Sequence, residues 1–285
     1  MQEYRQGIEK DSKNECQTLL NTDQTVPKDS DTLFRDDWFQ ATCEKLRDRN
    51  GARVVNDIAR LIVPSAETLA TFGAIQLEDL VVGMNERWNE SIPLTPTAAR
   101  PQPDFCVGFR RSAFTNEQLK KLEPFTGNIF ASTKLCSFLL ATWRIYFPFF
   151  TCEVKCGLKG LDIADRQNAN SMTLAVKGLV ELFRFVKREN EVHREILAFS
   201  ISHDDKSVRI YGHYPVVDGD KTTFYRHPIK IFDFTNEEGK EKWTAYKFVK
   251  NVYDTFMPKH HKLICSAIDD IPVNLNFDVP SASFR

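Results

Sequence analysis

Apolar residues along the chain fall into two patterns, one with the spacing of a helix and one with the continuity of a buried strand. The clearest helical stripe runs from Asp162 to Lys187, where apolar residues recur at steps of three and four. The densest aromatic run covers residues 146–155 and predicts a strand, and residues 104–110 predict another. Later strands are expected at residues 196–202, 208–216 and 224–234. Strands interleaved with helices predict the α/β class.

The C-terminal half carries further signals about these elements. His203–Ser207, between two of the predicted strands, is typical of a hairpin turn. Pro228 lies inside the last predicted strand, and because proline lacks a backbone N–H, this strand is expected at an edge or a bend. An apolar stripe from Trp243 to Phe256 predicts a helix that Pro258 ends. Residues 266–285 are expected to form a C-terminal tail.

The N-terminal part of the chain divides into a polar segment and a helical one. Residues 1–30 hold few apolar residues and no sustained period, so we expect a disordered tail there. Residues 31–90 carry several helical stripes, the last of them between Leu77 and Met84, and predict a helical N-terminal extension packed on the core. Prolines make residues 91–103 an extended connection into the following strand.

Composition narrows the class of protein. The 285 residues are 42% hydrophobic, enough for a substantial core, and 38 Lys and Arg nearly balance 39 Asp and Glu. Any attraction to nucleic acid must therefore come from a local patch. The seven cysteines show no CxxC pairing, and neither a signal peptide nor an apolar run of membrane-spanning length is found. We expect an intracellular protein of the cytoplasm or nucleus that does not contact membrane.

An acid and a base lie two residues apart in the aromatic run, at Glu153 and Lys155, and would share one face of a strand. Asp104 opens the other central strand. Two carboxylates and a main-chain carbonyl, that of Val154, are the hard oxygen ligands that Mg²⁺ or Mn²⁺ prefers. Such a cation can activate water and neutralise a phosphate, while Lys155 would orient or deprotonate the attacking water. These residues predict hydrolysis of phosphodiester bonds.

Pro103-Asp104, followed by Glu153-Val154-Lys155 on an apolar strand and then a helix, resembles the PD-(D/E)XK nuclease superfamily. More narrowly, the run Phe147–Gly157, with residues 162–169 and His193–His203, resembles a fungal family of uncharacterised proteins assigned to that fold. This resemblance covers about residues 50–270.

The resemblance implies a restriction-endonuclease-like core, with a mixed central β-sheet flanked by helices, over residues 91–265. Asp104 and Glu153 lie further apart in the chain than the superfamily's pattern has them, so residues 112–145 are interpreted as a helical insertion. Gln167, at the start of the following helix, matches a position that supports the site in several branches. Glu86 matches an acid on the helix before the Pro-Asp strand and is a further candidate metal ligand. The implied activity is a metal-dependent nuclease acting on DNA or RNA without a nucleotide cofactor.

Several alternatives stay open. Glu153 and Lys155 could form only an ion pair at a strand end. The protein could keep the nuclease fold without turnover and act as a module that binds nucleic acid or protein. Cys152 and Cys156 are interpreted as core packing rather than as nucleophiles. The histidines lack metal-ligand spacing and are interpreted as surface residues or as core residues whose polar atoms are hydrogen-bonded.

Overall fold

A computed structural model of the chain describes residues 3–27, 32–95, 97–126, 136–157 and 160–272. A mixed sheet of seven strands lies at the centre of these residues, in the order β1-β2-β4-β5-β6-β7, with β3 paired to β4 beside this path. Its strands are β1 (Leu80–Gly83), β2 (Phe105–Phe109), β3 (Leu140–Thr142), β4 (Ile145–Val154), β5 (Ala198–His203), β6 (Ser207–Asp218) and β7 (Lys221–Asp233). The predicted α/β class and mixed central sheet are confirmed.

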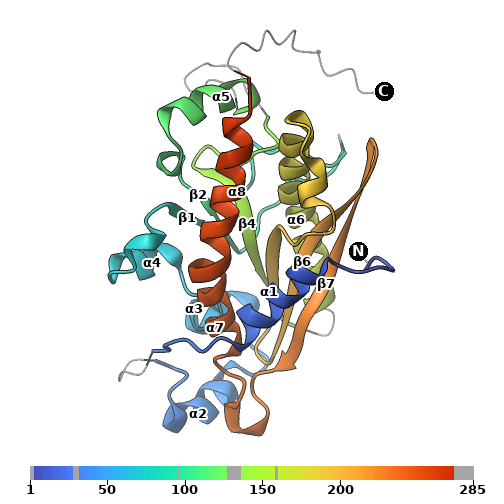
Figure 1. Cartoon of the computed structure of the whole chain (residues 1–285). Coiled ribbons are helices and arrows are strands. Elements are labelled where there is room, and N and C mark those ends of the chain that lie inside the picture. Colours follow the sequence, from blue (N-terminus) through green and yellow to red (C-terminus); the bar gives the residue numbers. More distant parts are fainter. Residues whose placement is uncertain (1–2, 28–31, 96, 127–135, 158–159, 273–285) are drawn as a thin grey trace.

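Helices flank this sheet, with an N-terminal helical region before β1 (Figure 1). The α-helices are α1 (Lys10–Asn21), α2 (Asp36–Leu46), α3 (Gly51–Ile62), α4 (Ala66–Thr71), α5 (Asn116–Thr126), α6 (Gly160–Phe185), α7 (Thr244–Asn251) and α8 (Met257–Asp269). Shorter turns are the 3-10 helices η1 (Ile75–Leu77), η2 (Arg111–Ala113), η3 (Glu189–Val192) and η4 (Glu237–Gly239), and the π-helix η5 (Val252–Phe256). Among the described residues, no helix is both long and apolar enough to cross a membrane.

The two faces of the sheet are covered by different helices. Asn168 of α6 hydrogen-bonds to Thr151 of β4 and Ser202 of β5. Phe199 of β5 instead packs against Phe256 of η5, with ring centroids 4.8 Å apart. Ser202 and Phe199 point to opposite faces because side chains alternate along a strand. Thus α6 covers one face, and α7 with η5 covers the other.

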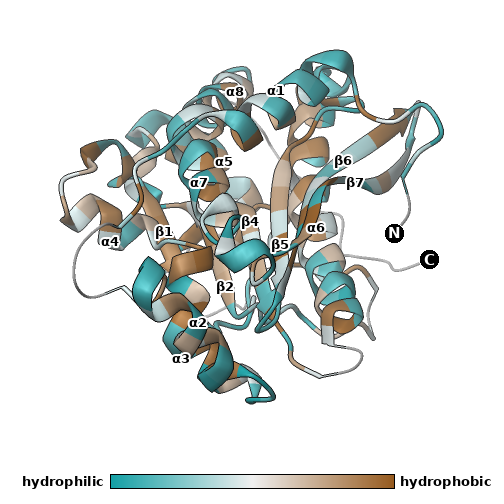
Figure 2. Ribbon diagram, turned by 90° about the horizontal axis from the view of Figure 1, so that it is seen from below, coloured by the Kyte–Doolittle hydropathy of each residue, from teal (hydrophilic) through white to brown (hydrophobic). Residues whose placement is uncertain are grey.

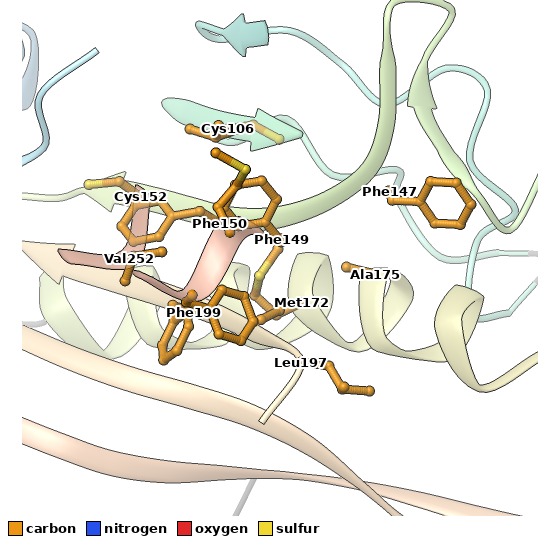
Figure 3. Close-up of a cluster of buried hydrophobic side chains, with 14 of the residues drawn as sticks. Cys106, Phe147, Phe149, Phe150, Cys152, Met172, Ala175, Leu197, Phe199 and Val252 are labelled. Carbon is orange, nitrogen blue, oxygen red and sulfur yellow. The ribbon is translucent and has the colours of Figure 1, made fainter. Parts of the chain in front are cut away.

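The hydrophobic core is built around β4, all ten residues of which are buried. Figure 3 shows part of it, where Phe150 of β4 and Phe199 of β5 gather near Met172 of α6 and Val252 of η5. Of the seven free cysteines, Cys16, Cys106 and Cys152 are buried in the core, and the cluster drawn in Figure 3 contains Cys106 and Cys152. Burial raises the pKa of the Cys152 thiol well above its usual value, which agrees with a packing role.

Strand register sets the positions that matter for function. β2 and β4 are antiparallel, with Phe105 opposite Cys152, and β4 and β5 are parallel, with Glu153 opposite Ser202. The chain passes from β4 to β5 through α6, a helical crossover of the kind that parallel strands need. The C-terminal end of β4 is therefore next to the N-terminal end of β2.

The predicted disordered tail is wrong for residues 10–21, which form α1. Cys16 and Leu19, three residues apart, are buried on one side of this helix. The side-chain amide of Asn251 donates to the carbonyl oxygens of Leu19 (2.9 Å) and Thr22 (2.7 Å), which closes the end of the helix. Because Asn251 is more than two hundred residues away, the composition of residues 1–30 could not predict this helix.

The helical stripe predicted from Leu77 through Met84, ending near residues 85–88, is also wrong, because Leu80–Gly83 form strand β1. A four-residue apolar run is too short to separate helix from strand by its period. These residues form a strand because they pair with β2, from Leu80 opposite Phe109 to Gly83 opposite Cys106. This places a strand ahead of the Pro-Asp strand, earlier in the chain than the proline-rich connection.

The remaining boundaries differ in smaller ways. In the predicted insertion, α5 is helical, β3 is a strand that extends the sheet beside β4, and residues 127–135 lie outside the described residues. Pro258 does not end the C-terminal helix, because it occupies the first turn of α8, where its missing N–H costs nothing. The C-terminal tail was expected from residue 266, but α8 continues to Asp269, and residues 273–285 lie outside the description.

Candidate active site

Asp104, Glu153 and Lys155 meet where β2 begins and β4 ends. Because Phe105 pairs with Cys152, the preceding Asp104 comes next to Glu153. The Lys155 ammonium donates to Glu153 Oε2 at 2.9 Å and to Asp104 Oδ2 at 3.0 Å. The backbone N–H of Val154 also donates to Asp104 Oδ2, at 2.8 Å. The fold thus brings together the three side chains that the sequence singled out.

The three residues differ in their access to water. Glu153 is buried, with 2% of its side chain exposed, whereas the side chains of Asp104 and Lys155 are 27% and 30% exposed. Burial raises the pKa of the Glu153 carboxyl to about 7, despite the opposing effect of Lys155, and the Asp104 carboxyl adds to the rise. The site therefore opens to solvent beside Asp104 and Lys155, with Glu153 as its floor.

Lys155 acts as a cation in this arrangement. Burial alone would lower the pKa of its ammonium, but the hydrogen bond and charge of Glu153, and then of Asp104, raise that pKa above its usual value. A protonated lysine donates hydrogen bonds and cannot accept a proton from water. Of the two roles expected for Lys155, orienting water or deprotonating it, this geometry favours the first.

A group of buried, hydrogen-bonded polar side chains lies close to Glu153, between the sheet and α6. Asn168 accepts from Thr151 Oγ1 at 2.8 Å and donates to Ser202 Oγ at 3.0 Å and to the Ile201 carbonyl at 2.8 Å. Ser202 is the residue paired with Glu153 across β4 and β5. Asn168 therefore fixes α6 against the strands that carry the site. Sequence reasoning missed it, although it is adjacent to the predicted Gln167.

The structure does not bring Gln167 to the other three residues. Its side chain is exposed on α6, and within the described residues it forms no hydrogen bond to Asp104, Glu153 or Lys155. The next residue, Asn168, faces the sheet because it lies four residues before the buried Met172, on the apolar stripe of α6. Gln167 lies off this stripe, and the spacing of apolar residues in the sequence is the signal that could have identified Asn168.

Glu86 was expected on a helix before the Pro-Asp strand, and this prediction is wrong. It lies in the loop after β1 and pairs with Arg144 at 2.8 Å. The neighbouring Asn85 donates its backbone N–H to the Asp104 carbonyl at 3.1 Å, so this loop supports the start of β2. Glu86 itself makes no hydrogen bond or ion pair with the three site residues in the described part of the chain.

Comparison with known families gives one match, to the DUF7924 family, described as a domain of unknown function, over residues 38–268. The chain belongs to the DUF7924 family. The match contains every strand of the sheet and all three converging residues, whereas α1 precedes it. Comparisons with curated proteins and with solved structures find no match.

A divalent cation at this site of the DUF7924 domain would have few protein ligands. Among the described residues, no group of three or more His, Cys, Asp or Glu side chains could hold a metal ion. Asp104 and Glu153 supply two carboxylates, and the Val154 carbonyl lies beside Gly51 of α3, since a Cβ built on Gly51 would be 3.5 Å from it. The donor set fits a hard cation that keeps several water ligands. The pKa of Glu153 is raised although Lys155 lies beside it, so the ammonium does not fully compensate the cost of burying the carboxylate.

Histidines in the DUF7924 core do not follow the prediction that their polar atoms are hydrogen-bonded. His203, His213 and His260 are buried, and each has one ring nitrogen without a partner among the described residues. His203 ends β5, opposite Val154, and its Nδ1 lies 3.0 Å from the Asp204 carbonyl. Burial lowers the pKa of His203, which keeps its ring neutral next to the site.

Proposed function

We propose that this protein hydrolyses phosphodiester bonds of DNA or RNA, using Mg²⁺ or Mn²⁺ held by Asp104 and Glu153. The observation that carries the proposal is the convergence of these carboxylates with Lys155 at the solvent-facing end of two paired strands. The resemblance to PD-(D/E)XK nucleases supports the same reading of the three residues.

Each residue would have a distinct task. The two carboxylates, with the Val154 carbonyl as a further candidate ligand, would hold the cation, which would activate water and neutralise phosphate charge. Lys155, kept protonated by its carboxylate neighbours, would donate a hydrogen bond to the attacking water or to a phosphate oxygen as negative charge develops. Asn168 would keep α6 and the strand ends in place, without touching substrate.

The direct test is cleavage of labelled single-stranded and double-stranded DNA and RNA by the purified full chain. Cleavage is expected with Mg²⁺ or Mn²⁺ and not with EDTA. Glu153→Gln keeps the shape of the side chain and removes its charge, so we expect a rate loss of about 100-fold or more, the scale on which electrostatic stabilisation of a transition state acts. Lys155→Met should cause a loss of similar size.

Glu195→Gln is the matched control for Glu153→Gln. Glu195 is a half-buried carboxyl whose pKa is also raised, chiefly by burial, but it precedes β5 and accepts a hydrogen bond from Ser12 of α1. This variant should cleave at the wild-type rate. The proposal fails if wild-type protein cleaves none of the four substrates with either metal, or if Glu153→Gln cleaves as fast as wild type.

A second candidate function is a nucleic-acid or protein binding module without turnover. It is favoured by one observation: the Lys155 ammonium already bridges both carboxylates, at 2.9 and 3.0 Å, so the pair has a cation without any metal. Calorimetric titration with Mg²⁺ and Mn²⁺ separates the two candidates. Heat of binding that disappears in Asp104→Asn supports the enzyme, and absence of binding to wild type supports the module.

A further inference from the structure

A surface depression lies between α2 and α3, next to the site. The two helices are neighbours in both Figure 1 and Figure 2. The depression has a volume of about 780 Å³ and is lined by Lys45, Arg49 and Arg53, with Asp48 as its acidic residue. Three cations against one acid stand out in a chain whose net charge is −1.

The first turn of α3 borders this depression on one side and packs on the site backbone on the other. Asn50 and Ala52 line the depression, and Gly51 between them is packed against β4, where a Cβ on Gly51 would be 3.5 Å from the Val154 carbonyl oxygen. Val154 is the residue between Glu153 and Lys155. The start of α3 therefore connects the depression with the strand end that carries the catalytic candidates.

A second depression continues the first along α2. It has a volume of about 390 Å³ and shares Lys45 and Arg53 with the first. Its wall includes Trp38, which is 43% exposed, seven residues before Lys45 and hence on the same face of α2. The Arg35 guanidinium lies 3.7 Å from the Trp38 ring centroid. The groove thus combines a basic part with an exposed aromatic side chain.

The cations of the groove are not equally available. Arg53 pairs with Asp57 at 2.7 Å within α3. Lys45 and Arg49 are exposed, and in the described part of the chain neither forms an ion pair with a carboxylate. The Arg49 guanidinium donates to the Lys45 carbonyl, at 3.2 Å. These two side chains can therefore neutralise the charge of a ligand.

We propose that the groove between α2 and α3 binds single-stranded nucleic acid and leads it to the site at Asp104, Glu153 and Lys155, an inference that rests on the proposed function. Lys45 and Arg49 contact successive phosphates, and Trp38 stacks on a base. An unpaired base offers its face to an aromatic side chain, whereas the bases of a duplex are already stacked on each other. The combination of a basic track with an exposed indole therefore selects single strands.

The test is fluorescence anisotropy of labelled 16-nucleotide oligo-dT and oligo-U with the full chain in EDTA, where binding is measured without cleavage. The double variant Lys45→Ala/Arg49→Ala should weaken binding at least tenfold. It should also reduce the slope of log affinity against log salt by about 1.4, since each lost single-strand phosphate contact contributes about 0.7. Trp38→Ala should weaken single-strand binding by about 10-fold and leave duplex binding unchanged.

Lys13→Ala/Lys221→Ala is the matched control, with the same change of charge. Lys13 is exposed on α1, and Lys221 is exposed at the tip of the β6–β7 hairpin, opposite Asp218. This control should bind oligonucleotide as wild type does. Equal affinities for wild type and the groove variant, no binding to wild type, or tighter binding of a duplex than of a single strand would each overturn the inference. Groove-dependent binding without cleavage would instead count against the nuclease proposal alone.

Discussion

Burying a charged or titratable side chain costs free energy, and the chain accepts this cost at several single residues. Glu153 is the clearest case, because the Lys155 ammonium offsets part of the loss of water while the nearby Asp104 carboxyl opposes the charge of Glu153. A buried carboxyl held at a pKa of about 7 is a feature that functional sites share. The sequence could predict this residue because an acid and a base two apart stand out in an otherwise apolar strand.

Asn168 shows what remains hidden at the residue scale. The apolar stripe of α6 includes Asn168, four residues before the buried Met172, but only the fold reveals its contacts with Thr151 and Ser202. Gln167 was chosen by its match to the superfamily, and it lies off this stripe and is exposed. Periodicity thus predicts which residue faces the sheet, whereas tertiary packing decides its partners.

His260 should make the fold sensitive to acid. It stacks against Phe256 and packs beside Phe109 and Phe149, and burial lowers its pKa to about 3. The unfolded chain takes up a proton below about pH 6.5, whereas the folded ring stays neutral, so stability present above that pH is lost as pH falls toward 3. His260→Phe should retain about 2 kcal/mol more of its stability than wild type between pH 7.5 and pH 5.

Urea unfolding at the two pH values measures this difference. Phe256→Leu, which changes the same cluster without changing a titrating group, should lower stability by a similar amount at both pH values. If His260→Phe loses as much stability on acidification as wild type, the neutral buried state assigned to His260 is wrong.

At the scale of elements, the pairing of β2 with β4 depends on a bulge. The register shifts between Val107 and Phe109, and Phe147 on the opposite strand has a positive φ of 44°, which is rare for a bulky residue. Gly108 lies inside this bulge, and a Cβ there would come within 2.7 Å of Ile145 Cγ2 and of the Tyr146 carbonyl oxygen. The bulge therefore needs a residue without a side chain.

Gly108→Ala is expected to destabilise the protein by about 1–3 kcal/mol, the usual cost of overpacking a core. Gly51→Ala is the matched control, because a Cβ there would meet only the Val154 carbonyl oxygen at an ordinary 3.5 Å. Denaturant unfolding of both variants gives the comparison. Equal midpoints for Gly108→Ala and wild type would show that the bulge can relax.

The elements that the sequence predicted well are those with a long, uniform pattern. β4 and α6 are recovered to within two residues, because ten continuous buried positions and twenty-six helical ones carry strong periodic signals. β1 was missed because four residues fit either period. The helix around Pro258 was cut short because the π-helix η5 shifts the phase, so that proline begins a new helical turn instead of ending one.

At the scale of the whole molecule, the N-terminal segment is bound to the C-terminal one. Asn251 of α7 is buried and accepts a hydrogen bond from Gln24 at 2.9 Å, in addition to closing the end of α1. Neither segment shows this in its own composition. The groove beside the candidate site was equally unpredictable, because it requires α3 to dock on β4 from a distant part of the chain.

Asn251→Leu should release α1. It removes three hydrogen bonds and leaves the carbonyl oxygens of Leu19 and Thr22 without their partner, at a cost of about 1–3 kcal/mol for an unsatisfied buried group. Hydrogen exchange followed by mass spectrometry should then speed up in residues 10–21 and stay slow in β4. Asn56→Leu, an exposed position on α3, is the control. Unchanged protection of α1 in Asn251→Leu would show that apolar packing alone holds it.

The position of β7 at the outside of the sheet bears on how copies of this protein meet in a crowded solution. A thirteen-residue edge strand has unpaired backbone N–H and C=O groups along its outer side, and such edges can pair with strands of other chains and start aggregation. Pro228 interrupts the row of backbone donors along this strand, because its nitrogen carries no hydrogen. The proline that marked this strand in the sequence thus also helps to keep the chains apart.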